Sequence, residues 1–266
     1  MLRKTLLAAV AAGSAFGLST STASAALLLH DPFDQAVGSI NGTKSTTGTW
    51  PGSGTWNGTG TISAGSLSYG PLLTSGNQAN YDAVANANRQ IGASLGGANT
   101  DLWVSFLIAA NRNDSGISFF TGGTEQNFMG NGGGSGQTLG LQNPNINTGI
   151  AQSTATHMYV LRMQTGATGN ITTTLYIDPA TSSLGTGTAP TGSLFDNSAS
   201  PNTTRLPYSF DTVRLGAFNS AGTVRFDELR IGTSWVDVSP VPEPTAAAGV
   251  LLAAGGLLAR RRRRGV

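Results

Sequence analysis

Short apolar runs separated by turn-forming residues dominate the central part of the chain, and no sustained helical period of 3.6 residues is present there. Asp101–Ala110 (DLWVSFLIAA) is the strongest run, and its residues are apolar on both faces of a strand. A strand covered on both sides has this pattern. We predict further strands at Ala26–Leu29, Ser66–Tyr69, Gly116–Thr121, Met158–Gln164, Ile171–Ile177, Ser209–Phe218 and Thr223–Ile231. Many short strands separated by turns are typical of an all-β sandwich.

Segments rich in Asn, Gly, Ser and Thr connect these strands and predict three hairpins. The hairpins would join residues 101–110 to 116–121, 158–164 to 171–177, and 209–218 to 223–231. Residues 38–60 are rich in Gly, Thr and Asn, and residues 77–88 have only a weak pattern of Ala and Asn. Neither segment has a sustained period, so we interpret both as loops.

The N-terminal residues have the features of a secretory signal peptide. Arg3 and Lys4 precede an apolar stretch, and Ala23 and Ala25 flank Ser24 in the small-x-small pattern of a cleavage site. We therefore predict that signal peptidase removes residues 1–25 and that the mature chain begins at Ala26.

The C-terminal residues 241–266 contain three parts in a fixed order. Pro242, Glu243 and Pro244 come first, and the two prolines hold the chain extended. An apolar run then extends from Thr245 to Ala259, which would span roughly 22 Å as a helix and is short for a bilayer core of about 30 Å. The last part is the arginine cluster Arg260, Arg261, Arg262, Arg263 and Arg264. Basic flanks stay on the cytoplasmic side, so the domain before Pro242 would face away from the cytoplasm.

This tripartite order resembles the PEP-CTERM sorting signal, which a membrane protease-transpeptidase called exosortase recognises and removes during export. The resemblance implies that exosortase acts on the chain, and that the membrane holds the short C-terminal helix only before processing. The product would then reside in the cell envelope, at the cell surface or in the extracellular matrix. An ordinary C-terminal membrane anchor is the alternative. The arginine run lacks interleaved aromatic residues, so we predict no nucleic-acid partner.

The residues between the two signals, 26–240, form the predicted folded domain. Without Arg3, Lys4, Glu243 and the tail arginines, eight basic and twelve acidic residues remain, which gives a net charge of −4. A mildly acidic domain with few charges is a poor ligand for polyanions. The chain has no cysteine, so the domain must be stabilised by its own hydrophobic core.

Two segments of this domain are similar to LamG-like (concanavalin A-like) jelly rolls of bacterial envelope proteins. The first is His30-Asp31-Pro32-Phe33-Asp34, and the second is Phe226–Gly232 followed by Ser234, Trp235 and Val238. The resemblance implies a jelly-roll sandwich of two antiparallel sheets in which the first and last strands are neighbours. This domain would be flanked by the N-terminal signal helix and the short C-terminal hydrophobic helix. Some members of the family bind glycans or protein ligands.

Glycoside hydrolysis is the natural enzyme hypothesis for such a scaffold, but the sequence does not favour it. Retaining glycosidases need two carboxylates about 5–5.5 Å apart in one cleft. Asp227 and Glu228 are adjacent, so they should point to opposite faces of a strand. His30 and His157 are the only histidines and lie far apart, so a zinc site is not indicated. We predict a non-catalytic structural or glycan-binding component of an exopolysaccharide matrix, with a polysaccharide-cleaving enzyme as the alternative.

Trp50 and Trp56 lie in the predicted 38–60 loop and are the candidate pair for stacking on sugar rings. Packing of that loop onto the sheet is the alternative, and we favour it. Asp31, Asp34 and Asp178 lie at strand ends near prolines and could bind Ca²⁺, although a role as turn formers is favoured. No other cofactor is indicated.

Asp227 follows the strand alternation of Leu229 and Ile231, so we expect its side chain on their face and partly buried. A buried carboxylate must find hydrogen-bond donors. We predict a structural role for Asp227, bonded to backbone or to an arginine near the first strand.

Overall fold

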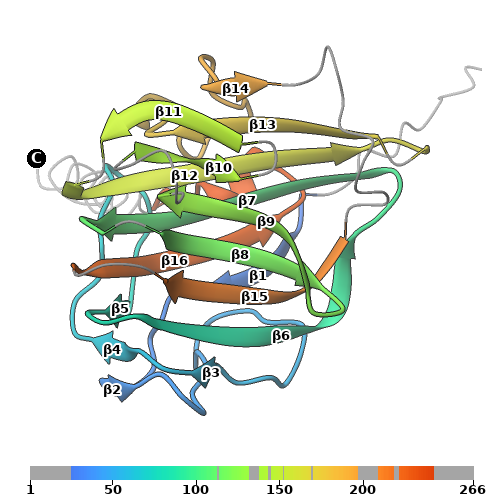
Figure 1. The fold of residues 1–266 in the computed structure, drawn as a ribbon. Coiled ribbons are helices and arrows are strands. Elements are labelled where there is room, and N and C mark those ends of the chain that lie inside the picture. Colours follow the sequence, from blue (N-terminus) through green and yellow to red (C-terminus); the bar gives the residue numbers. More distant parts are fainter. Residues whose placement is uncertain are drawn as a thin grey trace, which may run out of the picture.

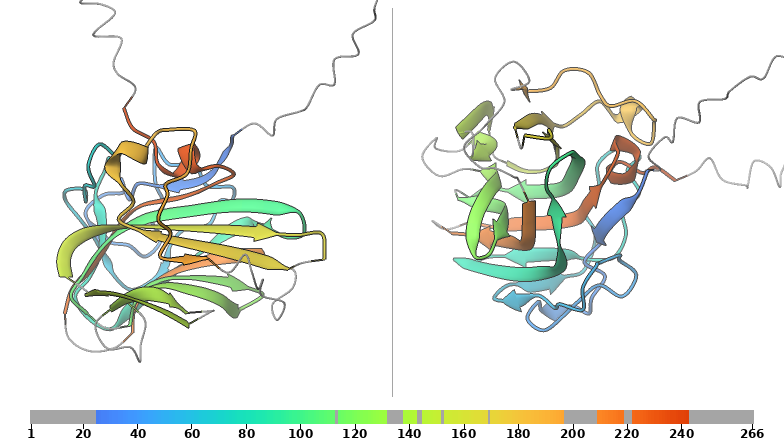
Figure 2. Two further views of the ribbon diagram at one scale, coloured as in Figure 1. Left: turned by 90° about the horizontal axis from the view of Figure 1, so that it is seen from above. Right: turned by 90° about the vertical axis from the view of Figure 1, so that its right-hand side faces the viewer.

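In the computed structural model, two antiparallel sheets pack face to face (Figures 1 and 2). The structure describes residues 25–112, 114–131, 138–142, 145–151, 153–168, 170–196, 209–218 and 222–242. Sheet A contains β1 (Leu27–Asp31), β2 (Gly38–Ser39), β4 (Thr61–Ser63), β5 (Gln78–Tyr81), β7 (Thr100–Ala110), β12 (Ser153–Thr165), β13 (Ile171–Ile177), β14 (Phe195–Asp196) and β16 (Val224–Gly232). Sheet B contains β3 (Asn57–Gly58), β6 (Ala85–Gly96), β8 (Ser115–Thr121), β9 (Thr124–Asn131), β10 (Thr138–Gln142), β11 (Asn145–Ala151) and β15 (Ser209–Ala217).

The strand orders define a jelly-roll sandwich, as the sequence predicted. Sheet A has the order β14-β13-β12-β7-β16-β5-β4-β2, with β1 also paired to β16, and sheet B has the order β11-β10-β9-β8-β15-β6-β3. The first and last strands are neighbours, because Leu29 pairs with Ile231 and His30 pairs with Arg230. This confirms the predicted proximity of the two segments on which the LamG-like resemblance rests.

Two of the three predicted hairpins are wrong, because consecutive strands change sheets. Residues 101–110 belong to β7, which pairs with β12 and β16 in sheet A, whereas β8 pairs with β9 and β15 in sheet B. The strands β15 and β16 are divided between the sheets in the same way. The chain therefore passes from one sheet to the other between these strands instead of forming a hairpin. The third hairpin is confirmed, since β12 pairs with β13 over Tyr159–Thr165.

The segment interpreted as a loop at residues 77–88 instead forms β5 and the start of β6. Within β6, Ala87, Arg89 and Ile91 are buried, while their polar neighbours Asn88 and Gln90 are exposed. The period of two is present, but small or charged residues at its inward positions conceal it. Conversely, residues 66–69 were predicted as a strand and form a loop. The 38–60 segment is irregular apart from the two-residue strands β2 and β3.

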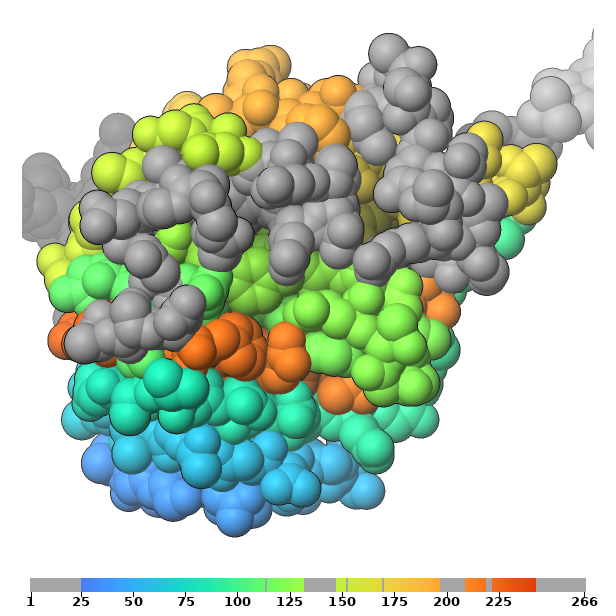
Figure 3. Space-filling model, in the orientation of Figure 1, coloured from blue at the N-terminus to red at the C-terminus, as the bar shows by residue number. Residues whose placement is uncertain are grey.

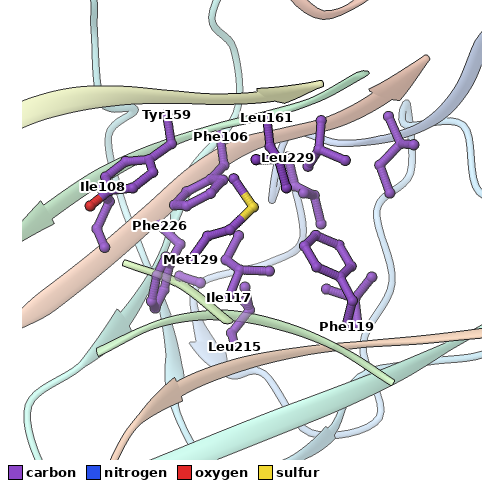
Figure 4. Packing of buried hydrophobic residues seen from close by; sticks show 14 of the residues in the cluster. Phe106, Ile108, Ile117, Phe119, Met129, Tyr159, Leu161, Leu215, Phe226 and Leu229 are labelled. Atoms are coloured by element: carbon purple, nitrogen blue, oxygen red, sulfur yellow. The ribbon is translucent and has the colours of Figure 1, made fainter. Parts of the chain in front are cut away.

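The main hydrophobic core fills the space between the sheets (Figure 4). Phe106 of β7 and Tyr159 of β12 stack with ring centroids 5.0 Å apart, on the sheet A side. Ile117 and Met129 face them from sheet B and are fully buried. Alternating inward residues of both sheets thus build one continuous core.

A second hydrophobic cluster covers the outer face of sheet A. Trp103 and Leu107 project outward from β7, and Trp235 of the short helix α1 (Trp235–Val238) packs on Trp103 with ring centroids 5.9 Å apart. The loop that contains the 3₁₀ turn η1 (Thr181–Ser183) adds Leu184 to this cluster. Figure 2 (left) shows the loop and α1 over this face. These contacts confirm that β7 is covered on both sides.

The two described ends of the chain lie on this same side of the molecule (Figure 2). Ala26 exchanges hydrogen bonds with Thr233, which follows β16. Pro242 is the last described residue, so Glu243, Pro244, Arg260–Arg264 and, at the other end, Ala23 lie outside the described part of the chain. Within the described part, no helix is long and apolar enough to cross a membrane.

Candidate functional site

The outer face of sheet B carries the candidate site, a polar groove along its central strands. Outward residues line up across β6, β15 and β8: Gln90 lies opposite Thr212, which lies opposite Phe120, and one row further Asn88 lies opposite Arg214. A pocket of about 560 Å³ is lined by Gly54, Thr55, Asn57, Asn88, Gln90, Phe120, Gly123, Thr212 and Arg214. A second pocket of about 560 Å³ shares Gln90, Gly123 and Thr212 and extends towards Asp211. The two pockets adjoin at these shared residues, and we call them together the groove.

One wall of the groove is the glycine-rich segment before β3. A Cβ atom at Gly52 would lie 2.7 Å from the backbone oxygen of Ile91, and one at Gly54 would lie 2.9 Å from that of Gln90. Glycine is therefore needed for this segment to lie flat against β6. The segment ends in β3, where Asn57 pairs with Asn88. The close approach places Asn57 beside the polar residues of the sheet.

Arg214 is the cation at the centre of the face, which Figure 3 shows in space-filling form with β15 in orange between β6 and β8. Its guanidinium carbon lies 4.5 Å from the ring centroid of Phe120 and 4.4 Å from that of Phe218. Its Nη2 donates to Glu125 Oε1 at 2.7 Å and to Ser118 Oγ at 3.1 Å. Burial lowers the pKa of Arg214, and the charge of Glu125 opposes this shift. The Arg214 guanidinium thus contacts two aromatic rings and is paired with one carboxylate.

The chemistry of this groove suits hydrogen bonding to a hydroxyl-rich ligand. Side-chain amides and hydroxyls both donate and accept, and aromatic faces pack on the apolar faces of sugar rings. The carboxylates at the groove already have partners: Glu125 pairs with Arg214, and Asp211 accepts from the Gly122 N–H and the Thr212 hydroxyl. Both carboxylates are therefore held by local contacts.

Trp56 packs into the core, which is the role that the sequence favoured over stacking on a ligand. Its side chain is fully buried, stacks on Phe33 at 5.9 Å and donates from Nε1 to Asp31 at 3.0 Å. The indole is held in the core because a buried carboxylate needs donors. Trp50 is half-buried, and its Nε1 donates to the Gln90 backbone oxygen at 2.9 Å. One of its faces is occupied by Arg89, 3.8 Å from the ring centroid.

Asp31 belongs to a buried ion pair. Its Oδ2 lies 2.5 Å from Nη1 of Arg89, and both side chains are almost completely buried. Burial raises the pKa of Asp31, while the charge of Arg89 and hydrogen bonds from Phe33 and Trp56 oppose the shift. The Nε of Arg89 donates to the Gly54 backbone oxygen at 2.9 Å. This pair therefore ties β1 to β6 and to the wall of the groove.

The three aspartates considered for Ca²⁺ do not form a common site. Asp34 accepts hydrogen bonds from Thr46 and Thr47; burial raises its pKa, but these bonds outweigh that effect and hold it well below its usual value. Asp178 contacts His157, and Asp31 pairs with Arg89. Among the described residues, no group of three or more His, Asp or Glu side chains is placed to hold a metal ion. Each carboxylate is satisfied locally.

A β-bulge in β16 overturns the expected placement of Asp227. The register shifts between Asp227 and Arg230, and Glu228 has a φ of 50°. Consequently Phe226 and Leu229 both face the core, and Asp227 turns to the loop on the outer side of sheet A. It accepts from Ser66 Oγ at 2.5 Å and from the Leu67 N–H at 2.8 Å. Its predicted structural role, bonded to backbone, is confirmed.

Burial raises the pKa of Asp227 to about 8; hydrogen bonds from Ser66 and Leu67 oppose the shift, and the neighbouring charge of Glu228 reinforces it. Glu228 itself is buried and contacts His30 at 2.8 Å and Arg230 at 2.7 Å. Its Oε1 also accepts from the Ser75 N–H at 2.6 Å. The carboxylate considered for the enzyme alternative is therefore enclosed by structural partners.

No family model matches the chain, and no curated protein sequence matches it. Among solved structures, it is similar to the globular domain of T. cruzi calreticulin, with 17% identity over 79% of this chain and 89% of that one and a TM-score of 0.44. It is also similar to an endo-β-1,4-glucuronan lyase from the fungus Trichoderma reesei (13% identity, 81% and 99% coverage, TM-score 0.46). A third is domain 4 of an extracellular arabinanase from Geobacillus stearothermophilus in complex with arabinotriose, with 15% identity over 80% of this chain and 94% of that one and a TM-score of 0.45. Likeness at this level supports no argument about activity.

Sequence reasoning missed the groove residues Asn88, Gln90, Phe120, Thr212 and Arg214. The available signal was the alternation of polar residues with inward-facing ones in residues 86–91 and 212–215. That alternation predicts a half-exposed strand. It does not predict that the exposed halves of three strands from distant parts of the chain meet on one face.

Proposed function

We propose that the protein is an exported component of the cell envelope or extracellular matrix that binds polysaccharide on the outer face of sheet B without cleaving it. The observation that carries the proposal is the open groove of amides, hydroxyls and aromatic rings across β6, β15 and β8. A groove open along its length can accept an internal stretch of a long polymer.

The position of the two described chain ends supports this role. Both described ends lie on the side of sheet A, opposite the groove. A chain held or attached through residues after Pro242 would therefore present the groove away from its attachment point.

The tail that resembles a PEP-CTERM signal supplies the proposed route: signal peptidase acts after Ala25, and exosortase acts near Pro242-Glu243-Pro244. Mass spectrometry of the mature protein tests this route, and a mature chain that retains Arg260–Arg264 would contradict it.

Glycan-array binding of the purified protein, followed by affinity measurement, tests the binding role. We expect Phe120→Ala to weaken binding by about 1–3 kcal/mol, on the scale of aromatic stacking on a planar ring. Asn88→Ala should weaken it through lost hydrogen bonds. The matched control is Leu73→Ala, because Leu73 is 45% exposed on the loop that covers sheet A. Equal loss in the control, or release of reducing sugar by the wild type, would overturn the proposal.

A further inference from the structure

Ser153, His157 and Asp178 meet where β12 begins and β13 ends. Oγ of Ser153 lies 3.2 Å from Nε2 of His157, and Nδ1 of the same ring lies 2.7 Å from Oδ2 of Asp178. An ionised carboxylate can only accept, so Nδ1 carries the ring proton and Nε2 is left as the acceptor. A hydroxyl, an imidazole and a carboxylate connected in this order form the arrangement that activates a serine as a nucleophile.

The serine hydroxyl is oriented towards the imidazole. The backbone N–H of Ala155 donates to Ser153 Oγ at 3.2 Å, which occupies one acceptor position of that oxygen. The hydroxyl proton is then free to point at Nε2 of His157. Ser153 and His157 reach each other within one strand because the register of β12 on β7 shifts between them. The bulge brings together two side chains that a regular strand would hold apart.

Asp178 is held in place by the backbone around it. Its N–H donates to the Met158 oxygen at 2.9 Å, and its Oδ1 accepts from the Met158 N–H at 3.0 Å. Its φ of 52° is in the left-handed region, although it precedes Pro179, where extended backbone is preferred. The Tyr69 hydroxyl donates to the Pro179 oxygen at 2.7 Å and secures this turn. Strain of this kind concentrates at functional sites.

We propose that these three residues hydrolyse esters of short acyl groups. Ser153 Oγ attacks the ester carbonyl carbon and its proton passes to Nε2 of His157. The C–O bond to the alcohol breaks, and the departing alkoxide takes the proton from His157. Water then attacks the acyl-serine, gives a proton to His157, and releases the carboxylic acid while Ser153 recovers its proton. One ester and one water become one alcohol and one acid. Asp178 is a positioning residue, which acts through the imidazole.

The surroundings indicate the size of the substrate. The side chain of His157 is 13% exposed and that of Asp178 is 35% exposed, so the site is reached from solvent at the end of the sandwich. An open strand end admits a large alcohol portion and offers little apolar enclosure for a long acyl chain. The site lies on sheet A, away from the groove of sheet B, so this inference does not depend on the proposed polysaccharide binding.

The test is reaction of the purified protein with a fluorophosphonate probe, in which a Ser153 Oγ–P bond forms, fluoride leaves and the serine proton passes to His157. We expect an adduct that peptide mass spectrometry locates at Ser153, and hydrolysis of p-nitrophenyl acetate that exceeds hydrolysis of p-nitrophenyl octanoate. Ser153→Ala should abolish both signals, and Ser183→Ala, which removes a partly buried hydroxyl that donates to the Ala180 backbone oxygen, should leave both unchanged.

Asp178→Asn should slow labelling of Ser153 at least tenfold, with partial recovery in Asp178→Glu. A purely structural network would alter the melting temperature without this pattern. Absence of an adduct at Ser153 in the folded wild-type protein would overturn the proposal. This experiment uses the wild-type protein alone, so it does not depend on whether any variant folds. Labelling of Ser153 that is unchanged in Asp178→Asn would overturn the positioning role.

Discussion

The two outer faces of the sandwich differ sharply. The outer face of sheet A is sealed by a second hydrophobic cluster, in which Trp103, Leu107 and Trp235 pack beneath a loop and a short helix. The outer face of sheet B is open along β6, β15 and β8 and carries amides, hydroxyls and the paired Arg214. Sequence alternation explains both. The outward positions of β7 include the apolar Trp103, Leu107 and Ala109, whereas the outward positions Asn86, Asn88 and Gln90 of β6 are polar.

The contrast separates stability from recognition. Residues on the covered face should contribute mainly to folding, because their apolar surface is removed from water. Residues on the open face should contribute mainly to binding, because solvent still reaches them in the free protein. Substitutions on the two faces and between them test this division.

Trp103→Ala should destabilise the protein by about 3–5 kcal/mol, the range for removal of a large buried aromatic side chain. Trp103 is 3% exposed and contacts the rings of Tyr176 and Trp235. Urea unfolding monitored by circular dichroism measures the change. The matched variant on the open face is Phe120→Ala, which should cost less than about 1.5 kcal/mol because Phe120 is only half-buried. Equal losses for the two variants would remove the distinction between the faces.

Arg89 points inward from β6, the strand whose outward side chains line the groove, and Arg89→Met tests its ion pair with Asp31. The substitution leaves the fully buried Asp31 without its cation, so we expect a loss of about 3 kcal/mol or more. The double variant Asp31→Leu with Arg89→Met removes both charges and should be more stable than Arg89→Met alone. If the single and double variants unfold at the same urea concentration, the ion pair is not what ties β1 to β6.

Asp227, on the covered side of sheet A, should make the free energy of unfolding of the protein depend on pH. Its pKa is raised from 3.8 to about 8 by burial, so between these values the native state binds the proton more tightly than the unfolded chain. The stability contributed by the neutral group is full below about pH 4 and is lost as pH rises towards 8. We expect wild-type stability to fall by at least about 1 kcal/mol more than that of Asp227→Asn between pH 5 and pH 8. Urea unfolding at several pH values measures this difference, and parallel curves would contradict it.

The sequence predicted two features of the fold correctly, one from the pattern of a single strand and one from the similarity of the first and last strands to a known family. The apolar run of β7 indicated a strand covered on both sides, and the pairing of β1 with β16 followed from the LamG-like resemblance. The sheet assignment of β8 and β15 was mispredicted, because a short connecting segment can cross the sandwich as readily as it can form a hairpin. Nothing in the alternation of apolar and polar residues along β16 indicates the bulge at Asp227 and Glu228.

The candidate site was less predictable than the fold. The polar segment that contains Trp50 and Trp56 allowed either ligand stacking or the favoured packing onto the sheet. The hydrogen bond to the buried Asp31 and the ring contact with Trp50 hold Trp56 in the core. The groove depends on how three distant strands are placed side by side. That placement is a property of the sheet topology, which local pattern does not encode.

Binding of polysaccharide at the groove can be tested by hydrogen exchange with and without the polysaccharide that binds most tightly in the array. We expect bound polymer to slow exchange in residues 86–92, 117–122 and 212–215, the segments of β6, β8 and β15 that line the groove. Exchange in residues 66–73 and 180–186, which cover sheet A, should be unchanged. Protection confined to those covering segments, with none in the groove, would contradict the account.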